Sequence, residues 1–275
     1  MRTDLEQAPV VDVRPLLSRE RAELVSLLRT LSPAEWDRRT AVPGRTVKDL
    51  GLLVLGDDLG WLSRERDGER SGQLDPTVAY RDSAEALGQK NQRLADALGG
   101  LSTRLLCDLL VWSGDETDAY YAEVDLRAEG SVSWASDDSV PMWFDLAQDL
   151  TERWRHQHQM REALSCVGDF EASYVPAVLR TFVWALPHQY RVWAPNGTTV
   201  DVDLAAGGVW HLTATLAGRW GLAEGPSTSP AARATFSASV AWRWLSGAAY
   251  DRDEVSVAGQ QHLIGPLMAV RATSI

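Results

Sequence analysis

Glu152 and His156 are the two residues of this sequence whose types and spacing could do chemistry together. They lie in the segment TERWRHQH, which begins at Thr151. Residues four apart share one face of an α-helix, so both side chains can converge on one point. This spacing suits two ligands of a divalent metal ion, or a carboxylate that orients an imidazole for proton transfer. The alternative is a surface pair that adds only a few tenths of a kcal/mol to the stability of the helix.

The other reactive side chains have no partner at a ligand or catalytic spacing. The remaining histidines are expected to be structural or at the surface: His158, His188, His211 and His262. Cys107 follows a leucine-rich helical pattern and is predicted to be a buried, small apolar residue, and Cys166 has no neighbouring base to make it a nucleophile. The motifs GxGxxG, GxxxxGKS/T, GxSxG, HExxH and CxxC are absent from the sequence, which removes several large enzyme classes.

The chain has twelve tryptophans, and packing in the core is the expected role for most of them. This prediction covers Trp36, Trp112, Trp134, Trp154 and Trp184. Trp154 also lies next to the face that carries Glu152 and His156, so it is a candidate to line a substrate pocket.

The charge of the chain argues against nucleic acid and membrane partners. The 275 residues carry a formal net charge of −11, and hydrophobic residues make up 45% of the composition, as in a well-packed globular protein. Residues 1–165 hold 30 acidic and 20 basic side chains, and residues 166–275 hold 8 and 7. An acidic surface repels phosphate backbones and anionic lipids. The first 25 residues contain no secretory apolar run. We therefore expect a cytoplasmic protein with a small-molecule substrate, and the sequence contains no signal for its oligomeric state.

The first part of the chain has the periodicity of helices. Leu24, Leu27, Leu28 and Leu31 recur at spacings of three and four. Helix starts are indicated by Ser32-Pro33, by a capping-box spacing at Thr46, and by Ser102. The predicted helices span about 46–66, 82–98, 103–122 and 141–164, and a loop rich in Ser, Asp and Gly is predicted at 127–141.

After Gly168 the pattern changes to alternation. Apolar residues occupy every second position from Thr199 to Leu204 and from Trp210 to Leu216, which is typical of strands. Further strands are predicted near 232–239 and 254–257, with helices at about 171–185, 239–245 and 259–268. The fold class is therefore α+β, with a helical domain at 1–165 and a small α+β domain at 170–275.

Several stretches together resemble the mycothiol-dependent maleylpyruvate isomerase-like family, a branch of the DinB-like bundles. They are LSPAEWD from Leu31, VPGRTVKD from Val42, LGDDL from Leu55, LSRERDG from Leu62, SWA from Ser133, TERWRHQ from Thr151 and TFVWALP from Thr181. The resemblance implies an N-terminal DinB-like four-helix bundle and a small sterol-carrier-like C-terminal domain. It also implies a divalent metal ion, usually zinc, inside the bundle, where it activates a thiol cofactor or an electrophilic substrate.

The family's metal site takes a histidine from the second helix and a glutamate and a histidine, four residues apart, from the last bundle helix. Glu152 and His156 match the second pair, but Leu53 stands where the first histidine is expected. A catalytic zinc normally keeps three protein ligands, so we expect zinc to bind weakly or not at all. Asp57 lies one turn after Leu53 on the same helix face and could in principle replace the missing ligand. However, the pair Asp57-Asp58 is ordinary in the family beside an intact histidine, so this role is not expected. With Trp154, Leu53 and Asp57 are predicted to contact the substrate.

Three functions remain open. The first is a metal-dependent isomerase or transferase that acts with mycothiol on an unsaturated, electrophilic small molecule. The second is a metal-independent isomerase or cyclase of specialised metabolism, in which Glu152 and His156 form an acid–base pair. The third is a non-enzymatic small-molecule binding protein. We favour an enzyme with a degenerate metal site, and the sequence does not identify its substrate.

Overall fold

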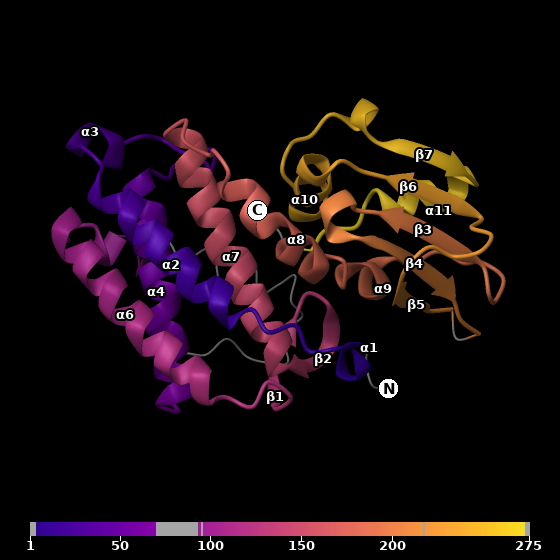
Figure 1. Ribbon diagram of the computed structural model, residues 1–275, viewed down its shortest axis with the longest axis horizontal. Coiled ribbons are helices and arrows are strands. Elements are labelled where there is room, and N and C mark those ends of the chain that lie inside the picture. Colours follow the sequence, from indigo (N-terminus) through magenta and orange to yellow (C-terminus); the bar gives the residue numbers. More distant parts are fainter. Residues whose placement is uncertain (1–3, 70–92, 95, 217, 273–275) are drawn as a thin grey trace. The chain divides into compact units, whose positions relative to one another are not determined.

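The computed structural model describes residues 4–69, 93–94, 96–216 and 218–272 (Figure 1). The chain forms two compact units, each built from separated stretches. Unit 1 comprises Met1–Val10, Glu129–Ala147 and Ala172–Ile275, and unit 2 comprises Val11–Ala128 and Gln148–Glu171. The sequence pattern placed a single boundary near residues 165–170. The structure divides the chain differently because a hairpin and the first turns of helix α7 (Met142–Ala163) belong to unit 1.

Unit 2 is helical, and its helices begin where the capping signals predict. Its elements are α2 (Arg14–Arg29), α3 (Pro33–Trp36), α4 (Val47–Trp61), the π-helical turn η1 (Leu62–Arg66), α6 (Thr103–Glu123) and most of α7. Ser32 and Thr46 form capping boxes with Glu35 and Asp49. The Ser102 side chain accepts from the backbone of Leu105. No helix within the described ranges is long and apolar enough to cross a membrane.

An apolar core holds the helices of unit 2 together. It contains Leu24, Leu28, Trp36, Leu50, Leu53, Leu106, Cys107, Leu110 and Met160, among others. These residues come from α2, α3, α4, α6 and α7, so each helix presents an apolar stripe to the same centre. Cys107 is 5% exposed, which confirms its prediction as a buried apolar residue.

Unit 1 contains a five-stranded sheet with short helices. Its strands lie in the order β5-β4-β3-β6-β7, and β3–β6 is the parallel pair within it. The strands are β3 (Thr199–Asp203), β4 (Val209–Ala214), β5 (Trp220–Glu224), β6 (Ala232–Thr235) and β7 (Ser256–Gly259). The helices are α1 (Asp4–Gln7), most of α8 (Phe170–Phe182), α9 (Ala185–Gln189), α10 (Ala238–Ser246) and α11 (Gln261–Leu267).

Two predictions about local structure were wrong or incomplete. The segment predicted as a loop at 127–141 contains an antiparallel hairpin of β1 (Glu129–Ser133) and β2 (Ser136–Pro141). Its polar composition hid this because tertiary packing stabilises it: Trp134 is 4% exposed and contacts Phe144 and Phe182 edge-on. Strand β5 was not predicted. The helix expected at 82–98 lies mostly outside the described residues.

Asp201 anchors the connection that crosses the sheet from β5 to β6. Its carboxylate is fully buried and accepts from the backbone and hydroxyl of Ser227 at 3.1 and 2.7 Å and from Arg233 at 2.8 Å. Burial alone would raise the pKa of Asp201, but the bonds from Ser227 and Arg233 outweigh it and lower the pKa. The carboxylate thus fixes the loop that makes the parallel β3–β6 pairing possible.

We expect Asp201→Ala to destabilise the protein by roughly 2 kcal/mol, because it leaves Ser227 and Arg233 without their buried acceptor. Urea unfolding at neutral pH measures the change. Asp203→Ala is the control on the same strand, since Asp203 is only half-buried and accepts one backbone hydrogen bond, from Ala205. Equal losses in the two variants would contradict the anchoring role.

Candidate functional site

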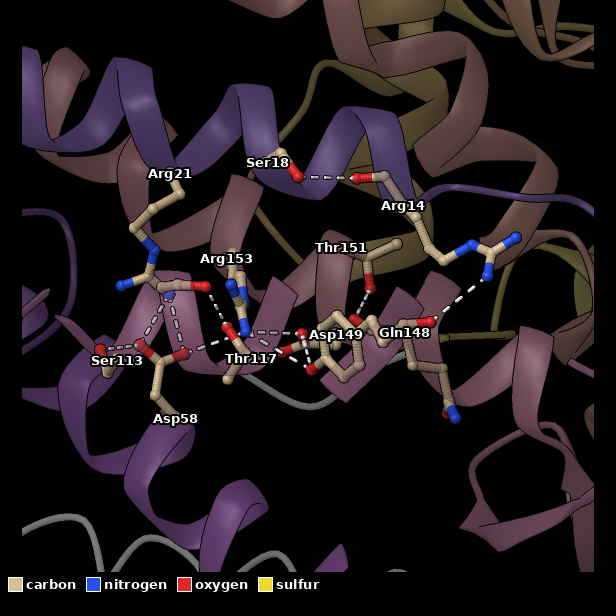
Figure 2. A network of polar contacts seen from close by, with 12 residues as sticks. Arg14, Ser18, Arg21, Asp58, Ser113, Thr117, Gln148, Asp149, Thr151 and Arg153 are labelled. Carbon is tan, nitrogen blue, oxygen red and sulfur yellow. Dashed lines mark hydrogen bonds and ion pairs between the residues drawn. The ribbon is translucent and has the colours of Figure 1, made fainter. Parts of the chain in front are cut away.

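The interior of unit 2 changes from apolar to polar along its helices. Beyond the apolar core, the same helices carry buried or partly buried polar groups that we call the polar layer: Glu20, Arg21, Asp58, Ser113, Thr117, Tyr121, Asp149 and Arg153. The polar residues lie in the first half of α2, in the middle of α7, toward the end of α4 and from the middle of α6 onward. Figure 2 shows most of this layer.

Asp58 is the centre of the polar layer. Its side chain is 1% exposed and lies 2.7 Å from the Arg21 guanidinium and 2.9 Å from that of Arg153 (Figure 2). The Ser113 hydroxyl donates to it at 2.6 Å. A buried carboxylate must be paired to offset its lost hydration. Since the partners come from α2, α6 and α7, this one group on α4 links all of those helices.

Arg153 extends the network to a second carboxylate. The nitrogen of Arg153 that contacts Asp58 also lies 2.9 Å from Asp149, and the Tyr121 hydroxyl donates to Asp149 at 2.8 Å. Burial and the negative charge of Asp149 raise the pKa of Tyr121 well above its ordinary value, so the phenol stays protonated as a donor. The Arg153 guanidinium is therefore shared between two carboxylates.

Glu20 is the buried group of this layer with the least compensation. Its side chain is fully buried, and within the described part of the chain neither carboxyl oxygen has a hydrogen-bond partner. Burial raises the pKa of Glu20 to about 7, against the opposing attraction of Arg21 and Arg153. The sequence pattern does not single out Glu20, because it lies in a charged run, although it shares a helix face with Leu17 and Leu24.

Asp57 lies beside the ion pair that joins α4 to α7. Asp57 as a whole is an exposed residue, yet the protein atoms around its carboxyl remove much of the hydration that a carboxylate needs. This loss of hydration, with the negative charges of Asp149, Glu152 and Asp58, raises the pKa of Asp57 to about 7. The π-helical segment η1 begins at Leu62, directly after α4 and shortly after Asp57. Such π-helical segments are frequent at functional sites.

The predicted pair on α7 consists of a carboxylate paired with a neighbouring arginine and an imidazole with one buried, unpartnered nitrogen. Glu152 accepts from Arg155 at 2.6 Å, and its side chain is 36% exposed. His156 is half-buried, and its Nδ1 atom is buried without a partner in the described residues. Burial, with the positive charges of Arg155 and Arg45, lowers the pKa of His156 to about 3, although a hydrogen bond with Gln159 opposes the shift. His156 is therefore a neutral imidazole at physiological pH.

Most of the other residues that the sequence singled out are buried, and Trp112 is exposed. Trp154 is fully buried and its ring centroid is 5.2 Å from that of His158, as expected for a packing role. His158 is itself buried and lies 2.9 Å from Glu171, so it is a paired structural histidine. Leu53 is 5% exposed within the apolar core. Trp112 is 46% exposed, and the prediction that it packs in the core was wrong.

The donor set does not fit the three-ligand zinc site that the resemblance implies. Leu53 offers only apolar surface at the position of the first ligand. The Glu152 carboxylate is already paired with Arg155. Among the described residues no group of three His, Cys, Asp or Glu side chains could hold a metal ion. Weak zinc binding stays a prediction, and no step of the chemistry below uses a metal.

Glu20 makes the stability of the protein depend on pH. Its pKa rises from 4.5 when unfolded to about 7 when folded, so the folded state holds its proton more tightly. Stability should therefore fall as pH rises from about 4.5 to 7, by at most about 3 kcal/mol. The raised pKa of Asp57, also about 7, contributes to the same fall. We therefore expect Glu20→Gln to reduce the slope of the profile without removing it, measured by urea unfolding across that range. Glu123→Gln, at an exposed position of α6, should keep the full slope; an undiminished slope in Glu20→Gln would contradict the assignment.

Comparison with known proteins bears on the fold. No family model matches the sequence, and no curated protein matches it. Among solved structures, the chain is similar to the mycothiol-dependent maleylpyruvate isomerase, with a TM-score of 0.54 and 17% identity over 94% of this chain and 96% of that one. A histidine-to-alanine mutant of that enzyme matches with a TM-score of 0.45 at the same identity and coverage. The resemblance seen in the sequence motifs is thereby confirmed: this chain has the fold of the mycothiol-dependent maleylpyruvate isomerase.

Proposed function

We propose that this protein is an enzyme of the isomerase or transferase type that acts on an unsaturated, electrophilic small molecule. The site consists of Asp57 on α4 and of Glu152 and His156 on α7. The observation that carries the proposal is the opposite protonation of two titratable groups in one helical unit. Asp57 keeps its proton up to a pH of about 7, whereas His156 has lost its proton above a pH of about 3.

The Asp58–Arg153 ion pair supports placing these residues in one site. Its length is 2.9 Å, and Asp57 and Glu152 are the immediate chain neighbours of its two members. The repulsion between Asp57 and Glu152 that raises the pKa of Asp57 is a second sign that the two carboxyls are near each other. His156 follows Glu152 by one turn of α7. The ion pair thus fixes α4 against α7 at the level of the proposed site.

The two shifted groups suit different tasks. A carboxyl with a pKa of about 7 can give and take a proton at physiological pH, as a general acid–base catalyst requires. A neutral imidazole keeps one N–H donor and can polarise a carbonyl group without carrying a charge. We assign the proton transfers to Asp57 and the orientation of the substrate carbonyl to His156. Loss of hydration is the main reason that Asp57 holds its proton, and the negative charges of Asp149 and then Glu152 add to the effect.

The structurally similar enzyme depends on mycothiol, and mycothiol is the cofactor that we propose here. A thiol supplies a nucleophile that can add to an activated double bond. We assign to Asp57 the proton that goes to the neighbouring carbon when the thiol adds, and that Asp57 takes back when the thiol is expelled and the double bond forms again. A cyclisation of the same class of substrate would use the same two residues and differ in its product. We propose that neither reaction needs a tightly bound zinc ion, because Leu53 replaces the expected ligand.

We expect kcat/KM to fall as pH rises through about 7, because the protonated form of Asp57 is lost there. Asp57→Asn should lower kcat/KM by roughly 100-fold or more and abolish this limb of the profile. His156→Ala should also lower activity, and chelator treatment should leave it unchanged. The assay follows the conversion of maleylpyruvate and related unsaturated oxo acids with and without mycothiol.

The control for this experiment is Asp37→Asn, which removes an exposed carboxyl at the end of α3. It should keep both the rate and the pH profile of the unmodified protein. Full activity in Asp57→Asn would refute the acid–base assignment. Binding of these compounds without turnover under all conditions would favour the non-enzymatic binding protein instead.

Leu53→His should restore the missing zinc ligand. In the apolar core an unpartnered imidazole is expected to cost about 1–3 kcal/mol, and bound zinc should recover that loss. We therefore expect the variant to unfold at a lower temperature than the unmodified protein, and zinc to raise its unfolding temperature and its metal content per chain. Leu59→His is the control, since Leu59 is 37% exposed on the same helix. Near-stoichiometric zinc in the unmodified protein would overturn the prediction.

A further inference from the structure

The surface between α2 and α6 is hollowed along its length. Two adjoining hollows, of about 230 and 550 Å³, lie between these helices and share Arg29. The smaller one lies between the end of α2, with Leu31 just beyond it, and the first turns of α6 from Thr103 to Asp108. The larger one lies between α2, from Ser18 to its C-cap Thr30, and α6 from Val111 to Asp118. The two helices therefore run antiparallel, and together the hollows form one groove, which we call the α2/α6 groove.

The α2/α6 groove has opposite charges at its two ends. Arg29 and Arg104 lie at the end where α2 finishes and α6 begins. Asp115 and Asp118 lie at the other end. Asp108 also lines the first end and, among the described residues, is the one ion-pair partner of Arg104, at 4.0 Å; the Arg104 side chain stays 93% exposed, so it can meet a second carboxylate. Arg29, Asp115 and Asp118 make no ion pair in the part of the chain that the structure describes, so their charges are available to another molecule.

The centre of the groove carries no free charge. It is formed by Ala22, Val25 and Ser26 on α2 and by Val111 and Gly114 on α6. Arg21 also lines it, but its guanidinium is paired with Asp58 in the interior. A glycine at position 114 is required because a Cβ there would lie 2.8 Å from the Arg21 side chain. Small side chains of this kind let another helix approach closely.

The groove is complementary to a second copy of itself. Val111 lies midway along α6 between Arg104 and Asp118, each seven residues away, or about 10 Å. A two-fold axis that runs across the groove at this centre lays α6 over the partner's α6 with the ends reversed. Arg104 then lies over the partner's Asp118, and Arg29, on the neighbouring α2, faces the acidic end that carries the partner's Asp115; the reverse pairs form by symmetry. The apolar centres then face each other. Such a match is specific to a self-associating surface, since opposite ends carry opposite charges.

We propose that the α2/α6 groove is the interface of a symmetric homodimer. Trp112 supports this assignment: it follows Val111 on α6 just outside the hollows and is 46% exposed, and tryptophan is among the residue types enriched at interface hot spots. The formal net charge of −11 per chain makes two copies repel each other at long range. Matched pairs at the two ends of the groove supply the local attraction that overcomes this repulsion.

A charge-swap experiment on the full chain tests the proposal. One variant carries Asp115→Arg with Asp118→Arg, and the other carries Arg29→Glu with Arg104→Glu. Sedimentation equilibrium should give the unmodified protein twice the mass of one 30.3 kDa chain. Each variant alone should have the mass of one chain, because like charges then face each other. An equal mixture of the two variants should regain the dimer mass, since every pair is again attractive.

Recovery of the dimer in the mixture also shows that both variants fold. If either variant unfolds, the neutral pair Asp115→Asn with Asp118→Asn replaces it and should weaken dimerisation by about tenfold. An unmodified protein with the mass of one chain overturns the proposal. Charge-reversed variants that remain dimers, or a mixture that stays monomeric, overturn it as well, because the interface then lies elsewhere.

Discussion

The Asp58 carboxylate sets the constraint on which unit 2 depends. A carboxylate that is 1% exposed survives only if charged partners replace its lost hydration, and two guanidiniums do this here. The second guanidinium, of Arg153, in turn needs Asp149. Because each buried charged group needs a partner, the network extends from one group to the next and joins α2, α4, α6 and α7. Such a network contributes little net stability, but it specifies one register of the helices, because a slip of any helix leaves a buried charge unpaired.

The chemistry assigned to the site follows from this network. Asp57 and Glu152 are the chain neighbours of the two members of the Asp58–Arg153 ion pair, so the pair restrains the backbone at both residues before any substrate arrives. Their mutual repulsion is then a permanent property of the fold. His156 lies at the transition from the polar layer to the apolar core, between Arg153 and Met160 along α7. The same helix thereby places a charged group, a neutral base and an apolar side chain within two turns.

Local signals predicted most of the elements but not the polar layer. Ser32, Thr46 and Ser102 mark helix starts because capping is a property of a few adjacent residues. Alternation predicted β3 and β4 because one face of each strand is buried. In contrast, Glu20 and Arg21 have the composition of a solvated helix face, and only their partners on distant helices keep them inside. The resemblance to the family directed attention to Leu53 and His156, whereas the titration of Asp57 depends on three carboxylates that the sequence alone does not bring together.

Because each unit is built from separated stretches of the chain, the two units fold in a defined order during translation. The last segment of unit 2 ends at Glu171, whereas the sheet of unit 1 is built from the later strands β3 to β7. Domains generally fold as units once their sequence is synthesised. Unit 2, with its buried charges, is therefore complete while the strands β3 to β7 are still being translated. The hairpin β1–β2 and the first turns of α7 must wait for those strands, attached to a helix whose other end is already folded.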